Sequence, residues 1–164
     1  GNAYANTRHN AGWMLLDALA KEVGAGEWKA APKFLAETNE ATIDGKGVLL
    51  LKLTTFMNRS GESVQKILSF YKLDAASKLL VVYDDIDLPL GTSRFRTAGG
   101  PGTHNGMKSI VTCIGENFPR FRIGLGPAPA ETDLANWILS KMTKEEGGSI
   151  SCLLQPMKEA IKEL

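Results

Sequence analysis

Two short apolar runs, each followed directly by polar residues, most constrain how this chain folds. The runs cover residues 48–53 and 79–83, and both have the length of a strand rather than of a buried helix. Continuously apolar strands are typical of sheets that are covered on both faces. Between them, residues 60–71 place Val64, Ile67, Leu68 and Tyr71 on one side of an expected helix. The pattern therefore predicts strands and helices in alternation.

The rest of the chain continues that alternation. We expect helices at residues 10–22 (capped by Thr7 or Asn10), 105–114 (capped by Asn105 or Thr103) and 133–141, and from residue 149 with an interruption at Pro156. We expect weak strands within residues 33–43, an edge strand at 93–96 and a further strand at 121–125. The sequence thus predicts one α/β domain over residues 1–164, with three layers and a mixed, mostly parallel sheet flanked by helices.

Composition excludes several classes of protein. The chain has 164 residues and a formal net charge of +1, so overall charge predicts no partner. The two cysteines have no metal-binding spacing and indicate a reducing compartment. No apolar run approaches the roughly 18 residues of a membrane helix, and the first residues are too polar for a signal peptide. We expect a cytoplasmic protein with no membrane contact, or one of an organellar stroma or matrix if the source is eukaryotic.

The chain has only two histidines, His9 and His104, and each directly precedes an asparagine. Polar clusters that follow predicted strands meet at one edge of an α/β sheet, so both histidines can share a crevice with Asp84. A carboxylate behind an imidazole makes a general-base pair, with His9 as the base and Asp84 as its partner. Simpler alternatives remain open here: His9 caps a helix, Asp84 caps a turn, and His104 binds the backbone of its loop.

Neither a metal nor a nucleotide motif is present. The spacing of histidines and carboxylates matches no metal-ligand pattern such as HExxH, so we expect no metal. The glycine-rich stretch at residues 99–106 lacks the lysine of a phosphate-binding loop, and it does not follow a buried strand.

Local charge is more informative than the overall charge. Residues 94–122 contain five basic residues and one acidic residue, namely Arg94, Arg96, Lys108, Arg120, Arg122 and Glu116. Guanidinium groups suit phosphate oxygens, so this stretch is a candidate contact for a nucleic-acid backbone. A solvated surface is the alternative interpretation.

At these residues the chain resembles bacterial-type peptidyl-tRNA hydrolases. The matching segments follow the order of the family over nearly the whole chain: residues 4–12, 55–61, 83–91, 104–110 and 118–124. The resemblance implies a single α/β domain without metal or cofactor. It further implies an enzyme that cleaves the ester between a peptide and the 3′ ribose of tRNA, with peptidyl-tRNA as the partner. We expect a monomer.

Site residues carry over by matched position. His9 is the expected base and Asp84 its carboxylate partner. The expected substrate-binding residues are Tyr4, Asn10, Met57, Asn58, His104 and Asn105, of which Asn58 and Asn105 would hold the peptide backbone and the developing oxyanion. The arginines expected to bind tRNA phosphate are Arg94, Arg96 and Arg122. Residues 133–142 correspond to a mobile lid.

Three departures from the family pattern are visible. The family begins with a strand ending in Leu-Gly-Asn-Pro-Gly, and Gly1 matches the last glycine, so either the sequence is a shortened one or this strand and its asparagine are missing from the protein. Thr103 and Ser140 each stand where a glycine is usual. The alternative functions are a non-catalytic RNA-binding relative that acts in organellar intron splicing, and an inactive remnant of the enzyme.

Overall fold

The computed structural model describes residues 6–164. Its strands are β1 (Lys29–Ala31), β2 (Ala36–Ile43), β3 (Lys46–Leu53), β4 (Val81–Pro89), β5 (Ser93–Arg96) and β6 (Arg120–Gly126). Its α-helices are α1 (Ala11–Glu22), α2 (Ser60–Tyr71), α3 (Ala75–Lys78), α4 (Asn105–Ile114), α5 (Leu134–Ile138), α6 (Lys144–Ser151) and α7 (Leu154–Lys162). Short 3₁₀ helices are η2 (Arg8–Asn10), η3 (Pro32–Phe34) and η4 (Met57–Arg59).

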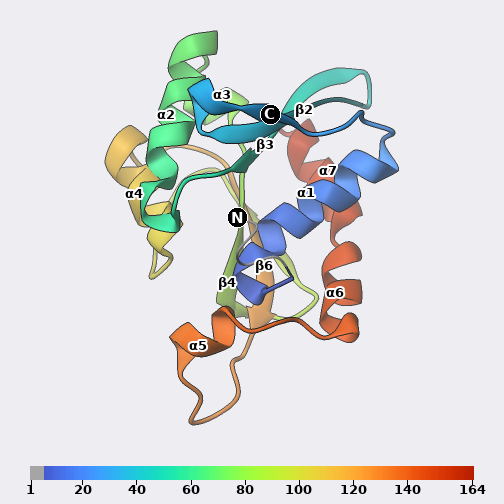
Figure 1. Cartoon of the computed structure of the whole chain (residues 1–164), viewed down its shortest axis with the longest axis vertical. Helices are drawn as coiled ribbons and strands as arrows, with labels where there is room; N and C mark the ends of the chain where they lie inside the picture. The colour runs from blue at the N-terminus through green and yellow to red at the C-terminus, as the bar shows by residue number, and fades with distance from the viewer. Residues whose placement is uncertain (1–5) are drawn as a thin grey trace.

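These elements form three layers around β4 and β6 (Figure 1). Helices α2 and α4 lie on one side of the two strands, and α1, α6 and α7 lie on the other. Two apolar clusters fill the spaces between the layers. One joins Leu15 and Leu19 of α1 to Ile123 of β6 and Met157 of α7, and the other is centred on Phe118 beneath α2 and α4. The predicted α/β class with helices on both sides is confirmed.

The strands differ in one respect from the expected mostly parallel sheet. They form two three-stranded sheets, β1-β2-β3 and β4-β6-β5, in which only the pairing of β4 with β6 is parallel. The connection between β2 and β3 explains much of the difference. It consists of Asp44 and Gly45, both at positive φ, which is the backbone of a tight hairpin turn and forces antiparallel pairing.

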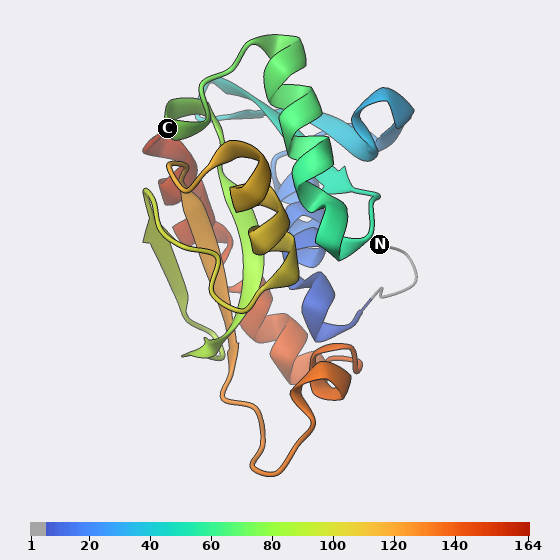
Figure 2. The same ribbon diagram turned by 90° about the vertical axis from the view of Figure 1, so that its left-hand side faces the viewer.

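Some predicted elements have the expected ends, and others do not. Helix α2 begins and ends where expected, and β5 is the predicted edge strand (Figure 2). Strand β4 does not stop before Asp84 but continues to Pro89, with an irregular register after Asp85. The C-terminal break comes before Pro156, which lies in the first turn of α7, where a backbone N–H has no helical partner to lose.

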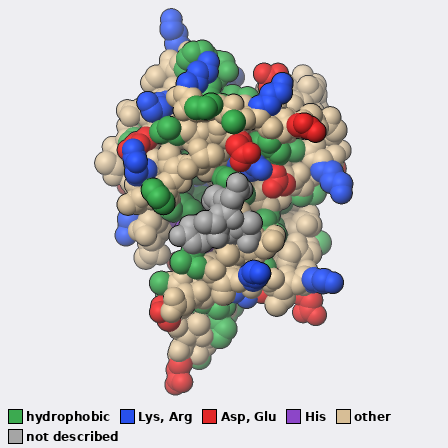
Figure 3. Space-filling view, viewed as in Figure 1, with side chains coloured by type: hydrophobic (Ala, Val, Ile, Leu, Met, Phe, Trp, Pro, Cys, Tyr) green, Lys and Arg blue, Asp and Glu red, His purple; other side chains and the backbone are tan. Residues whose placement is uncertain are grey.

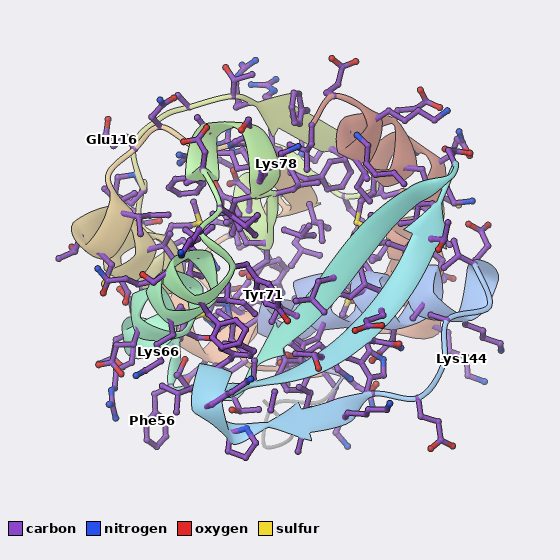
Figure 4. All side chains as sticks on the ribbon, turned by 90° about the horizontal axis from the view of Figure 1, so that it is seen from above. Phe56, Lys66, Tyr71, Lys78, Glu116 and Lys144 are labelled. Carbon is purple, nitrogen blue, oxygen red and sulfur yellow. The ribbon has the colours of Figure 1, made fainter. Side chains whose placement is uncertain are left out.

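Strands β3 and β4 belong to different sheets, and both line one cavity. Within residues 6–164, β3 pairs only with β2, and β4 pairs only with β6 among the named strands. A cavity of about 1340 Å³ lies between them and is lined mainly by apolar residues of β3, β4, α1 and α2. Seen from above, Tyr71 of α2 lies beside this opening (Figure 4). No helix in the described part of the chain has the length and apolar character needed to cross a bilayer.

Candidate active site

Asp84 lies between the two histidines of the chain and contacts both. Its Oδ2 lies 2.9 Å from Nδ1 of His9, and its Oδ1 lies 3.0 Å from Nε2 of His104. Asp84 is only 6% exposed, while both imidazoles are half-buried. The ring centroids of His9 and His104 are 5.1 Å apart. The ring of Tyr83 packs edge-on against that of His104, with 5.0 Å between the ring centroids. The predicted pairing of His9 with Asp84 is present, and His104 joins it from the other side.

The hydrogen bonds define which ring nitrogens carry protons. Nδ1 of His104 accepts the backbone N–H of Met107, so its Nε2 carries the proton that is donated to Asp84. In the neutral form of His9, Nδ1 donates to the ionised Asp84 and Nε2 then carries the lone pair. Within residues 6–164, no protein group hydrogen-bonds to that Nε2. The arrangement therefore presents one imidazole as a proton acceptor.

Asp84 remains ionised in this surrounding. Burial opposes its ionisation, but the hydrogen bonds from His104 and His9 outweigh burial and lower the pKa of the carboxyl below its usual value of 3.8. A carboxylate that receives two N–H donors is well suited to stabilise a positive charge that develops on either ring.

Close backbone approaches bring the three side chains together. His9 belongs to η2, which leads directly into α1, and a Cβ at Gly12 of α1 would lie 2.7 Å from the carbonyl oxygen of Val82 in β4. Only a glycine allows α1 to pack so near to β4. At Gly106, a Cβ would lie 2.6 Å from Sδ of Met57 and 3.0 Å from the His104 ring. This second glycine lets α4 approach both residues.

His104 combines two roles that the sequence presented as alternatives. It occupies the N-cap of α4, where its ring accepts a helix N–H, and it also binds Asp84. The predictions of Asn105 or Thr103 as the N-cap of α4 are therefore wrong, because the N-cap is His104, which lies between them. Asn10 takes the N-cap position of α1, but neither its side chain nor that of Thr7 caps a helix.

Of the other predicted substrate residues, Asn10 and Met57 line the same cavity as this cluster, whereas Asn58 and Asn105 are not among its lining residues. His9, Asn10, Met57, Asp84 and His104 all line the cavity between β3 and β4, at its polar end. Asn58 and Asn105 are exposed and each directly follows one of these lining residues. Phe56 is 76% exposed at the mouth and points away from the body of the protein (Figure 4). Tyr4 lies outside the described residues.

The triad also has the composition of a metal site. His9, Asp84 and His104 offer ligand atoms that lie within 4.8 Å of one another. A bound ion would have to replace both hydrogen bonds to Asp84, and Nδ1 of His104 is already engaged by a helix N–H. The donor set thus fits a hydrogen-bonded triad with its protons in place better than it fits a metal site.

The basic residues separate into three environments. Arg94 and Arg96 are exposed on β5, and within residues 6–164 neither forms an ion pair. Arg122 is bound by Asp85, with its Nε 2.6 Å from Oδ2. Arg120 is buried and donates to the carbonyl oxygens of Gly100, Glu116 and Phe118, so it holds loops together and is not available to a phosphate.

The four arginines nevertheless lie opposite one another in pairs on neighbouring strands. In the pairing of β5 with β6, Arg94 lies opposite Arg122 and Arg96 lies opposite Arg120. Strand β5 forms the outer edge of its sheet (Figure 2). By contrast, basic and acidic side chains are interspersed on the face shown in Figure 3.

Comparison with known proteins decides the family. A sequence profile described as peptidyl-tRNA hydrolase matches residues 1–164. The chain belongs to the peptidyl-tRNA hydrolase family. It is 42% identical to the peptidyl-tRNA hydrolase of Fervidobacterium nodosum over 162 residues, which are 99% of this chain and 82% of that protein. It is 48% identical to the enzyme of Carboxydothermus hydrogenoformans over 162 residues, 98% of this chain and 84% of that protein.

Solved structures of peptidyl-tRNA hydrolases share the fold. The crystal structure of the enzyme from Acinetobacter baumannii superposes with a TM-score of 0.83 at 35% identity, covering 99% of this chain and 88% of that one. The expected enzymatic function, hydrolysis of peptidyl-tRNA, is therefore confirmed at the level of the family. The alternative of a non-catalytic splicing factor finds no support among these relatives.

Two residues of the site were not singled out from the sequence. Tyr83 packs on His104, and Arg8 connects the segment before His9 to the C-terminal part of the chain. Their only sequence signal was their position beside Asp84 and His9. Side chains that only position other site residues are not part of a recognisable sequence motif.

Proposed function

We propose that His9 is the general base that activates water for hydrolysis of the ester in peptidyl-tRNA, with Asp84 as its carboxylate partner. The observation that carries this proposal is the Asp84 side chain, which uses one oxygen for each imidazole at the polar end of the cavity. Its hydrogen bond to Nδ1 leaves Nε2 of His9 as the proton acceptor.

The reaction then follows from this geometry. Nε2 of His9 takes a proton from water as the water oxygen attacks the carbonyl carbon that joins the peptide to the 3′ ribose. The Asp84 carboxylate stabilises the resulting imidazolium. When the tetrahedral intermediate collapses, the bond to the ribose oxygen breaks, and the imidazolium returns its proton to that oxygen. The products are a peptide carboxylic acid and tRNA.

Amide side chains are proposed to stabilise the oxyanion. General-base catalysis contributes roughly 10²–10⁴-fold, so donors to the developing negative charge must supply more. Asn58 and Asn105 are the candidates, because they stand next to Met57 and His104 at the polar end of the cavity and are exposed to solvent. Asn10, Met57 and His104 would line the peptide-binding side, together with Tyr4.

The tRNA is proposed to lie across the outer edge of the second sheet. Arg94 and Arg96 are exposed there and form no ion pair with residues 6–164, and Arg122 would contribute where it is not held by Asp85. We also propose that the enzyme acts as a monomer, because one chain supplies His9, Asp84 and His104 together, and that it acts in the cytoplasm, where its two free cysteines stay reduced. Sedimentation of the purified protein tests the monomer, and cell fractionation tests the location.

A direct test replaces His9 by alanine and measures single-turnover cleavage of peptidyl-tRNA. We expect the first-order rate to fall by about 10²–10⁴-fold, since this is the range that a positioned base contributes. His9→Asn is the matched variant, because it keeps a polar group at Nδ1 but supplies no base, and it should lose as much. Rates equal to the parent in both folded variants would remove His9 from the mechanism.

A further inference from the structure

Arg8, the residue before His9, is almost completely buried although it carries a charge. It is 9% exposed, and its guanidinium forms a two-pronged ion pair with Glu146, with Nε 2.8 Å from Oε2 and Nη2 2.7 Å from Oε1. The guanidinium carbon also lies 4.5 Å from the ring centre of Trp137. Nη1 donates to Oγ of Ser140 and to the carbonyl oxygen of Trp137. All of these partners lie more than 120 positions later in the chain.

The backbone on both sides is joined as well. The N–H of Arg8 donates to the carbonyl oxygen of Ser140 at 3.2 Å, and the N–H of Met142 donates to the carbonyl oxygen of Asn6 at 2.8 Å. Thr7 and Lys141 form an antiparallel bridge. Residues 6–8 and 140–142 therefore form a short two-stranded seam that ends one residue before His9.

Glu146 is fixed independently of Arg8. Its Oε1 accepts the backbone N–H of Thr143, while its own N–H donates to Oγ1 of Thr143, which completes a capping box at the start of α6. Burial opposes ionisation of Glu146, but the hydrogen bonds from Arg8 and Thr143 lower its pKa. Arg8 is thus bound to a carboxylate that is already held in place by a helix.

Ser140 adds a contact that a glycine at this position would lack. Its hydroxyl donates to the carbonyl oxygen of Trp137 at 2.6 Å and accepts from Nη1 of Arg8. We call Arg8, Trp137, Ser140 and Glu146 the latch.

We propose that Arg8 is a positioning residue, which the latch uses to hold η2 in register so that His9 stays on Asp84. The inference rests on the proposed function of His9 as the base. A three-residue 3₁₀ turn makes few internal hydrogen bonds and cannot fix its own orientation. Its C-terminal end continues into α1, and the latch holds its other end. Because a displacement of about 1 Å can reduce a rate by about 100-fold, loosening the N-terminal end of η2 lowers kcat through His9, while Asn10 stays anchored at the N-cap of α1.

Glu146→Gln is the central test, since it keeps the shape and the capping box but removes the charge that binds Arg8. We expect kcat for peptidyl-tRNA to fall by between about 10- and 100-fold, with KM within about twofold of the parent. Asp17→Asn is the matched control. It removes the negative charge from the 2.9 Å ion pair between α1 and Lys52 of β3, whose side chain is also largely buried, and Asp17 forms no hydrogen bond or ion pair with a latch residue. It should leave both kcat and KM near the parent values.

A second readout does not depend on catalysis. The His9 ring proton on Nδ1 that is bound by Asp84 gives a downfield NMR signal, which is assigned by its loss in His9→Ala. We expect this signal to broaden or disappear in Glu146→Gln and to persist in Asp17→Asn. If His9→Ala retained full activity, the proposed function would fail, and the signal would still report whether the latch positions the ring.

Graded variants complete the experiment. Arg8→Lys keeps the charge but loses the two-pronged geometry, and it should resemble Glu146→Gln. Ser140→Gly removes one hydroxyl and should lower kcat by a few fold only, and it takes the place of either variant that fails to fold. A normal kcat and an unchanged His9 signal in the folded latch variants would overturn the proposal, as would an equal loss in Asp17→Asn.

Discussion

Asp84 and Asp85 are neighbours on one strand, yet they serve two different regions of the molecule. Asp84 is buried and binds two imidazoles, whereas Asp85 binds Arg122 on the sheet that also carries Arg94 and Arg96. Alternate side chains of a strand point to opposite faces. One residue of displacement along β4 therefore separates the region proposed for bond cleavage from the region proposed for tRNA contact.

The two regions depend on different physics. Around Asp84 every hydrogen bond is specified in direction, because His104 is held by a helix N–H and His9 by the carboxylate. Around β5 the exposed arginines have no fixed partner among residues 6–164, and they act through charge at longer range. Changes in the first region should thus reduce the chemical step. Changes in the second should alter binding and its dependence on salt.

Asp84→Asn should produce the largest effect. The side chain keeps its shape, but the amide cannot accept from both rings, and it cannot stabilise the imidazolium that forms on His9. We expect kcat to fall by roughly 10²–10⁴-fold. Asp85→Asn is the neighbouring control and should leave the hydrolysis of a short ester mimic near the parent rate. Comparable losses in both variants on the short ester would remove the distinction between the two carboxylates.

Arg94→Ala combined with Arg96→Ala should have an intermediate effect that depends on the substrate. We expect KM for full-length peptidyl-tRNA to rise and the slope of log affinity against log salt to become shallower by about two. The same double variant should hydrolyse a short ester mimic like the parent. KM measured at several salt concentrations for both substrates decides this, and identical changes on both would argue against a phosphate contact.

How much of the fold could be predicted from the sequence depends on how far apart in the sequence the interacting residues lie. The helix at Ser60–Tyr71 was predicted to the residue, because its spacing of apolar side chains is a local signal. The hairpin at Asp44-Gly45 was missed although both residues favour positive φ. Strand β4 was ended too early because its aspartates suggest a turn, while in the fold Asp84 is satisfied by two histidines far away in the sequence.

The site residues likewise divide into those that the sequence predicted and those whose partners become apparent only in the folded chain. His9 and Asp84 were paired from their chemistry and from the family resemblance, and their side chains do meet. Arg120 carried the same sequence signal as Arg94, but it is buried and donates to two carbonyl oxygens just before it and to that of Gly100, 20 positions earlier, which no local pattern predicts. Arg8 had no signal beyond its position next to His9, because Glu146 and Ser140 approach it only in the folded chain. Long-range partners decide whether a charged side chain is exposed for binding or used to hold the fold.

The smallest expected effect concerns stability in acid, and it isolates Asp84 from the rest of the site. Its pKa is lowered below 3.8 in the folded protein, so ionised Asp84 stabilises the fold at pH values above about 3.8. That contribution is lost as the pH falls through the lower folded-state pKa. The difference in free energy of unfolding between the parent and Asp84→Asn should therefore be larger at about pH 5 than at about pH 2.5. Urea unfolding at each pH measures it, and since Glu146 is common to both proteins its own titration cancels. A difference that stays constant would mean that the two imidazoles do not favour the ionised carboxylate.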